Sequence, residues 1–122
     1  MKIAITASSP NLEADIDPRF GRCQYFIIID PETMQFESLE NTGPAAGSGA
    51  GVSTAQVIIS KGVDAMLTGN CGPNAHQALS AAGIKVITGV SGKVTEAAKD
   101  YKSGKLQAAD QPNVSAHSGM NT

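Results

Sequence analysis

A strand, a helix and a second strand follow one another closely in the second half of this 122-residue sequence, and they restrict its fold more than any other feature. The apolar segment 63–68 leads into a loop at 69–73 and a predicted helix at 74–82, and Gly83 then precedes a second apolar segment at 84–88. Two strands joined by one helix pair in parallel, and a parallel sheet is covered on both faces. The sequence therefore predicts an α/β fold.

The first forty residues predict three more strands. Segment 2–7 reads as a strand that ends in a polar loop, and segments 24–30 and 34–40 flank a turn at 30–33. The segment 24–30 is a nearly continuous apolar run, as expected of a strand that is covered on both faces. The two segments beside the turn are expected to form a hairpin.

Two further helices complete the predicted set. One begins at Ser53 and is ended by Gly62, and the other covers 93–103 with Gly104 as its C-cap. The apolar face of the last helix consists of Val94, Ala97, Ala98 and Tyr101. This order of elements predicts a mixed five-stranded sheet with three helices on its faces and one antiparallel strand.

The composition argues against several functional classes. With 41% hydrophobic residues, a net charge of -2 and only 4% aromatic residues, the chain has neither the charge nor the stacking surfaces that favour nucleic acid. No apolar stretch reaches the roughly 20 residues of a membrane helix, and no signal peptide is recognised, so we expect a cytoplasmic protein. One domain is expected over 1–106, followed by a flexible polar tail at 107–122.

Ligands of open α/β sheets bind beyond the carboxyl ends of the parallel strands. In this sequence the loops that follow those ends are 8–23, 69–73 and 88–92, with the segment 43–53 as a neighbour. The functional residues are therefore expected in these loops.

Arg19 and Arg22 are the only two arginines of the chain, against seven lysines spread elsewhere. Guanidinium groups are planar forks of donors that suit anions with several oxygen or sulfur atoms, and a spacing of three residues would let both arginines line one pocket. The alternative is that Arg19 pairs with Asp17 or Asp15 and holds the loop in place. The sequence leaves both interpretations open.

The segment 43–51 is rich in glycine and precedes a predicted helix. Unpaired backbone N–H groups and the helix dipole favour an anion at such a position. However, the glycines at 47, 49 and 51 lack the lysine of a phosphate-binding loop and do not follow a parallel strand in the dinucleotide-binding pattern. A flexible crossover is the other interpretation of this segment.

Cys71 lies just before the predicted helix at 74–82, with Pro73 suited to its first turn and His76 within that turn. The helix dipole is expected to stabilise a thiolate there, which would bind a soft metal or act as a nucleophile. The alternative is a buried cysteine beneath the sheet with an exposed histidine. Cys23 and Cys71 are too few for a disulfide framework and are expected to be free thiols.

Together these motifs resemble the family of dinitrogenase iron-molybdenum cofactor binding proteins. The resemblance covers residues 1 to about 106 and rests on the strand at 2–5, the motif at 17–22, the small-residue loop before 54–56 and the motif at 69–75. It implies a ribonuclease-H-like mixed five-stranded sheet. It also implies a non-catalytic protein that binds, stores or scaffolds a metal–sulfur cluster, with protein donors and acceptors of that cluster as possible partners.

The residue at position 19 restricts the kind of cluster that the resemblance implies. Members of the family that bind the nitrogenase cofactor have Asp-x-His-Phe-Gly in the first motif, with the histidine implicated in binding, whereas this chain has Arg19 there. An arginine would hold an anionic cluster by charge and hydrogen bonds. That is similar to the orange proteins of sulfate reducers, which hold a molybdenum–copper sulfide cluster without covalent attachment. The resemblance thus implies a thiomolybdate-like molybdenum–copper cargo, with an iron-molybdenum or iron–sulfur cluster as the alternative.

The candidate cofactor-binding residues belong to the three loop motifs: Arg19, Phe20, Gly21, Arg22, Ser48, Gly49, Gly51, Asn70, Cys71, Gly72, Asn74 and His76. Among them, Cys71 and His76 are the candidate metal ligands.

Three other functions are weighed against a carrier. In the first, Cys71 is a nucleophile and His76 its base, acting on a small anion held by the two arginines. In the second, the chain is a regulatory module whose pocket is vestigial. A nuclease, the third, would need clustered carboxylates, and the aspartates at 15, 17, 30 and 64 lie on segments that are not expected to converge.

Overall fold

The computed structural model of the chain describes residues 1–41 and 50–106, with the backbone alone at 50–53. The described residues form five strands: β1 (Ile3–Ala7), β2 (Tyr25–Ile29), β3 (Phe36–Glu40), β4 (Ala65–Leu67) and β5 (Lys85–Ile87). They also form three helices: α1 (Ala50–Ser60), α2 (Pro73–Ala81) and α3 (Val94–Lys102). The predicted α/β class is confirmed. The tail predicted at 107–122 lies outside the described residues.

The strands make one mixed sheet in the order β3-β2-β1-β4-β5. β2 runs antiparallel to its neighbours β1 and β3, whereas β1 pairs in parallel with β4, and β4 with β5. The predicted hairpin is the β2 and β3 pair, in which Tyr25 lies opposite Glu40 and Ile29 opposite Phe36. The mixed five-stranded sheet with one antiparallel strand is therefore confirmed, and its ribonuclease-H-like label stays a prediction.

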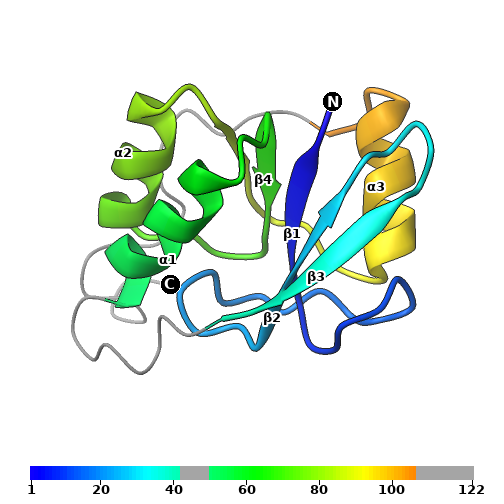
Figure 1. The fold of residues 1–122 in the computed structure, drawn as a ribbon, viewed down its shortest axis with the longest axis horizontal. Helices are drawn as coiled ribbons and strands as arrows, with labels where there is room; N and C mark the ends of the chain where they lie inside the picture. Colours follow the sequence, from blue (N-terminus) through cyan, green and yellow to red (C-terminus); the bar gives the residue numbers. More distant parts are fainter. Residues whose placement is uncertain (42–49, 107–122) are drawn as a thin grey trace.

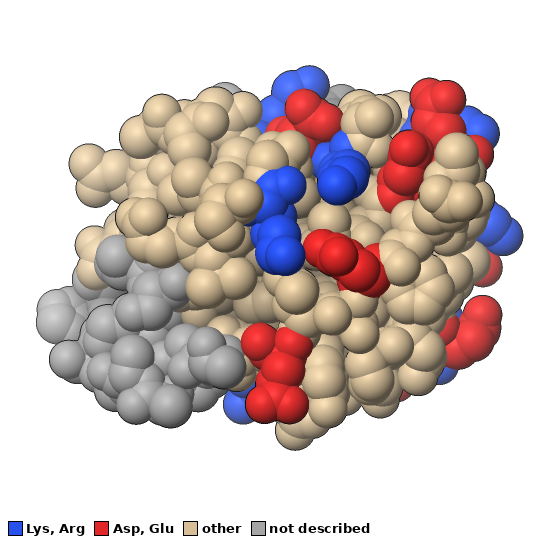
Figure 2. Space-filling model, viewed as in Figure 1, with Lys and Arg blue, Asp and Glu red and all other residues tan. Residues whose placement is uncertain are grey.

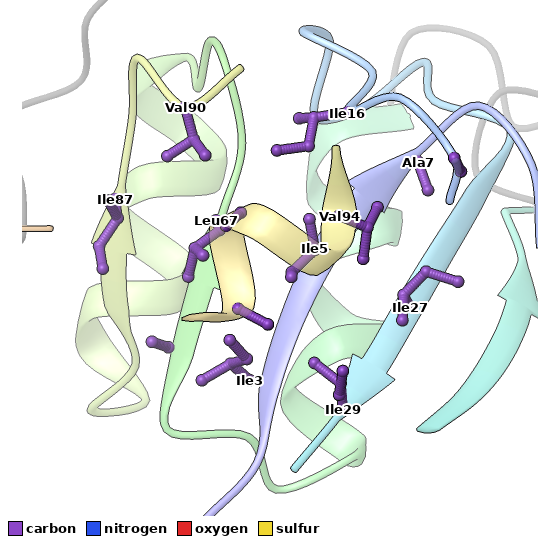
Figure 3. Close-up of a cluster of buried hydrophobic side chains, with 14 residues drawn as sticks. Ile3, Ile5, Ala7, Ile16, Ile27, Ile29, Leu67, Ile87, Val90 and Val94 are labelled. Carbon is purple, nitrogen blue, oxygen red and sulfur yellow. The ribbon is translucent and has the colours of Figure 1, made fainter. Parts of the chain in front are cut away.

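Helices cover both faces of the sheet, with α1 and α2 on one face and α3 on the other (Figure 1). Successive side chains of the central strand β1 point to opposite faces. Ile3 and Ile5 belong to the core under α3, where Figure 3 shows Val94 of that helix beside Ile5, and Ala4 belongs to the core under α1 and α2. This two-sided burial explains why β1, β2 and β4 are apolar with almost no alternation.

Most element boundaries lie within two residues of those predicted, and the start of α1 is the exception. The helix begins at Ala50, three residues before Ser53. Gly51 is a poor helix former by about 1 kcal/mol, which is why the pattern placed the start after it, but the packing of an amphipathic helix outweighs such a cost. Gly62 and Gly104 follow the ends of α1 and α3 with φ of 68° and 76°, a conformation that favours glycine.

Charged side chains of both signs are interspersed on the face of the molecule shown in Figure 2. Helices α1 and α2, which lie on this face, contain no Lys, Arg, Asp or Glu. No helix within residues 1–41 and 50–106 is long and apolar enough to cross a membrane.

Candidate functional site

Backbone hydrogen bonds join the loops that follow β1, β4 and β5 at one edge of the sheet. The amide of Asn70 donates to the carbonyl of Pro18 at 2.7 Å, and the amide of Phe20 donates to the carbonyl of Asn70 at 3.3 Å. The amide of Gly89 donates to the carbonyl of Gly69 at 2.8 Å. The predicted convergence of these three loops is confirmed.

Gly69 is the point of closest approach between two of the loops. A Cβ built on Gly69 would lie 2.7 Å from the Cα of Pro18 and 3.0 Å from its carbonyl oxygen, so a side chain there would push the loops apart. The glycine therefore permits the short backbone bonds that place the motif at 17–23 beside the motif at 69–75.

Two buried hydroxyl groups support the start of the first motif. Thr6 and Thr68, on β1 and just after β4, are both fully buried, and their hydroxyl oxygens lie 3.0 Å apart. The Thr6 hydroxyl donates to the backbone carbonyl of Asp17 at 2.6 Å. Since both threonines sit in the packed core, this bond fixes the backbone of Asp17 against the sheet.

Arg19 forms an ion pair with Asp17. Its Nε lies 3.2 Å from Oδ1 and its Nη2 3.3 Å from Oδ2 of the carboxylate, a two-pronged contact, and its backbone N–H donates to Oδ1 at 3.0 Å. The hydrogen bond and the charge of Asp17 raise the pKa of Arg19. Of the two interpretations of Arg19, the ion pair is observed, although the arginine side chain is still 61% exposed, against 7% for that of Asp17.

Arg22 differs from Arg19 in both its partners and its surroundings. Its side chain is exposed and makes no ion pair with any carboxylate in the described part of the chain. It borders an open cavity of about 340 Å³, whose other lining residues are Cys23, Gln24, Tyr25, Glu40 and Asn41. Arg22 is thus the arginine that makes no ion pair within residues 1–41 and 50–106, although Glu40 lines the same cavity.

Phe20 and Gly21 contribute to this region in different ways. Phe20 is 3% exposed, and its ring centroid lies 6.0 Å from that of Phe26 in the core under α1 and α2. It therefore anchors the loop by packing instead of facing a ligand. Gly21 contributes a backbone carbonyl, which accepts a hydrogen bond from the side chain of Asn41 at 3.4 Å.

Cys71 is fully buried, and burial raises the pKa of its thiol to about 11. This burial disfavours the thiolate that the helix dipole was expected to stabilise, because desolvation penalises the charged sulfur. Burial, with a contribution from the charge of Asp17, likewise raises the pKa of the Cys23 thiol, to about 12. Both cysteines are free thiols, as predicted.

His76 lies in the first turn of α2, as predicted. It is only 8% exposed, whereas the alternative interpretation expected an exposed histidine. Its Nδ1 lies 3.5 Å from the hydroxyl of Ser80, one turn along the helix. Within residues 1–41 and 50–106, no three His, Cys, Asp or Glu side chains are grouped so as to hold a metal ion.

The remaining candidates surround the helix starts. Gly72 is the N-cap of α2 and makes no side-chain capping bond, Pro73 is the first residue of that helix, and Asn74 is exposed in its first turn. Asn70 is exposed in the loop before them, and Gly51 lies in the first turn of α1. Ser48 and Gly49 lie outside the described residues.

The sequence patterns did not single out Asn41 or Thr54. The Asn41 side chain contacts the loop that carries Arg22 and also accepts a hydrogen bond from the buried hydroxyl of Thr54 in α1 at 3.3 Å. An asparagine between a strand and a glycine-rich segment reads as an ordinary turn residue. Its role becomes visible only in the folded protein, where the side chain contacts both the loop at 21–23 and helix α1.

Comparison with known proteins finds a matching protein family, similar solved structures and a related sequence. The sequence model of the family described as dinitrogenase iron-molybdenum cofactor matches residues 1–104. The apo form of the orange protein from Desulfovibrio gigas is 41% identical, with 92% of this chain and 95% of that protein covered and a TM-score of 0.88. A putative NifB protein from Thermotoga is 34% identical, covering 88% of this chain and 91% of its own, with a TM-score of 0.71. An uncharacterized protein of Methanocaldococcus jannaschii is 33% identical over 110 residues, which make up 88% of this chain and 90% of the relative.

Proposed function

The chain belongs to the dinitrogenase iron-molybdenum cofactor family, and from this premise we propose that it is a small carrier or scaffold that binds a metal–sulfur cluster as cargo and does not turn over a substrate. The family match and the likeness to the orange protein support a cluster-binding role. The cargo proposed is an anionic molybdenum–copper sulfide cluster, which the resemblance to orange proteins implies, with iron-molybdenum or iron–sulfur clusters as alternatives.

The exposed and unpaired charge of Arg22, within the described residues, is the observation that carries this proposal. An exposed guanidinium without an ion-pair partner among the described residues, at the edge where the loops converge, offers a planar set of donors to an anion. The N-termini of α1 and α2 would add backbone N–H groups and the positive ends of two helix dipoles. We propose that Arg22 and these helix starts, with Gly51, Asn70, Gly72 and Asn74, contact the cargo.

The burial of Cys71 supports a particular mode of binding. A thiol with a pKa of about 11 is protonated at neutral pH, and protonated thiols are poor ligands and poor nucleophiles. We therefore propose that charge and hydrogen bonds hold the cluster, and that Cys71 and His76 line the site beneath it. The same observation speaks against the enzyme in which Cys71 attacks a substrate and His76 is its base.

Two accompanying assignments stay predictions. Protein donors and acceptors of the cluster are expected because a cargo must be loaded and delivered. A cytoplasmic location is the second of these predictions.

The proposal is tested by the metal content and visible spectrum of protein purified from its native host. The apo-protein is then titrated with tetrathiomolybdate and copper(I). We expect charge-transfer bands that saturate at a fixed ratio of molybdenum and copper to protein. If metals stay substoichiometric and no bands appear, the carrier function is refuted and a module with a vestigial pocket is favoured.

A Cys71→Ser variant separates the two modes of binding. If charge and hydrogen bonds hold the cluster, the variant should retain it, because serine keeps the size of the side chain and no thiolate ligand is lost. Loss of the bands in a variant that still folds would show that the thiol is a ligand. Ser80→Ala, which removes an exposed hydroxyl beside His76, serves as the matched control.

A further inference from the structure

Asn41 joins three segments of the chain through one side-chain amide. Its Nδ2 donates to the carbonyl of Cys23 at 2.8 Å and to that of Gly21 at 3.4 Å. Its Oδ1 accepts the hydroxyl of Thr54, which lies in α1 and is fully buried, at 3.3 Å. Its backbone N–H donates to the carbonyl of Gln24 at 2.9 Å, which continues the hairpin one residue beyond β3.

The two carbonyls that accept from Asn41 belong to the residues on either side of Arg22. The amide therefore holds the backbone of Arg22 from both directions. Arg22 and Asn41 also line the same cavity of about 340 Å³. The direction in which the guanidinium leaves the loop thus depends on this amide.

Only a side-chain amide fits these partners. It offers donors to the two carbonyls and an acceptor to the hydroxyl of Thr54, whereas a carboxylate is an acceptor only and an apolar side chain is neither. Asn41→Asp would place a negative charge against two carbonyl oxygens and beside the Sγ of Cys23, 3.7 Å away. Asn41→Ala would remove the bonds and add no charge.

From this geometry we infer that Asn41 is a positioning residue of the anion site, which fixes Arg22 and ties it through Thr54 to α1. The inference rests on the proposed cluster-binding function. Asn41 acts without touching the cargo. The affinity of Arg22 for an anion depends on the side-chain amide of Asn41 and on its hydrogen bond to Thr54 of α1.

The test is a double-mutant cycle on the full-length apo-protein, with tetrathiomolybdate and copper(I) as the probe. Asn41→Ala should weaken binding about tenfold when Arg22 is present and should have no further effect in the Arg22→Ala background. Its effect on the midpoint of thermal unfolding should be the same in both backgrounds. A role confined to stability would change the affinity equally in both, which would overturn the inference.

Thr54→Val keeps the test valid if Asn41→Ala does not fold. It removes the hydroxyl that Asn41 accepts, and it should weaken binding in the same direction, whereas Thr54→Ser should restore it. Thr95→Val is the matched control, since it removes one hydroxyl bond, from α3 to the carbonyl of Leu12 at 2.7 Å, and α3 covers the face of the sheet opposite α1 (Figure 1). Equal affinities for Thr54→Val and Thr95→Val would contradict the inference.

A measurement without cargo separates this inference from the function on which it rests. The backbone order parameter of the Arg22 amide, from ¹⁵N relaxation, should fall in Asn41→Ala and stay at the parent value in Thr95→Val. A parent protein that binds no probe refutes the proposed function alone. An unchanged order parameter refutes the positioning role alone.

Discussion

Removal of Arg22 is expected to lower the affinity for an anion, and removal of Arg19 to lower the stability of the fold. The reason is that Arg19 pairs with a carboxylate, whereas Arg22 makes no ion pair among the described residues. Arg22→Ala removes a cation that makes no ion pair in the described part of the chain. A hydrogen bond to a charged group contributes about 1.5–3 kcal/mol, and exposure reduces this toward the lower limit, so binding of an anionic cluster should weaken about tenfold. The midpoint of thermal unfolding should not change.

Arg19→Ala should instead lower stability. It leaves the carboxylate of Asp17, 7% exposed, without its two-pronged partner. Oδ2 then loses its donor, whereas Oδ1 keeps the backbone N–H of residue 19, and solvent around the exposed arginine reduces the effect further. We therefore expect the unfolding midpoint to fall by about 2–4 °C. The loss of affinity should be smaller than for Arg22→Ala, because the Asp17 charge already opposes an anion there.

Calorimetry of the apo-proteins gives the unfolding midpoints, and titration with tetrathiomolybdate and copper(I) at low and high salt gives the affinities. The affinity of the parent should fall with added salt, and that of Arg22→Ala should fall less steeply. Lys61→Ala is the control for charge, since it removes a cation that lies 3.5 Å from Glu37, outside the candidate site. The reasoning is refuted if Arg19→Ala loses more affinity than Arg22→Ala at an unchanged unfolding midpoint.

Three other consequences of the structure can be measured directly. Gly69→Ala should destabilise the fold by about 2 kcal/mol or more, because its Cβ would meet the backbone of Pro18 at 2.7 Å, and a urea midpoint equal to the parent's would contradict that close approach. The folded protein should react slowly with iodoacetamide at pH 7, since Cys71 and Cys23 are both buried, with thiol pKa values of about 11 and about 12; rapid labelling mapped to Cys71 in the native chain would show that this thiol is accessible. The pKa of Cys71 is raised in the folded state from an ordinary value of 9.0, so its contribution to stability is fully present below pH 9 and is lost as the pH rises to about 11. Stability measured by urea unfolding should therefore fall across this range, and Cys71→Ala should reduce the slope; identical slopes for parent and variant would disprove the assignment.

The local elements were predictable because each has a pattern of its own. The apolar runs gave the strands, and the glycines at 62, 83 and 104 gave the ends of the helices. The order of the elements then implied the mixed sheet, because a strand–helix–strand unit pairs in parallel and a short turn pairs its strands antiparallel. The start of α1 was placed three residues late, because intrinsic propensity at Gly51 opposes what packing imposes.

The convergence of the loops that carry the candidate residues was predictable, whereas the state of their side chains was not. The rule that ligands bind beyond the carboxyl ends of parallel strands led to the loops at 17–23 and 69–73, which the backbone bonds bring together. The state of each side chain was not predictable, since the same spacing allows Arg19 to bind a ligand or to pair with Asp17. Likewise, a cysteine before a helix becomes a thiolate if it is exposed and a protonated thiol if it is buried.

The sequence by itself therefore determined the elements, their order and the edge of the sheet where the loops meet, because these follow from periodicity and short-range chain geometry. The tertiary structure alone decided three properties of the site: the neutralised charge of Arg19, the burial of Cys71, and the contacts of Asn41 with the loop at 21–24 and with Thr54. The physical reason is that solvation and hydrogen-bond partners depend on groups that are distant in the chain and close only in the folded protein.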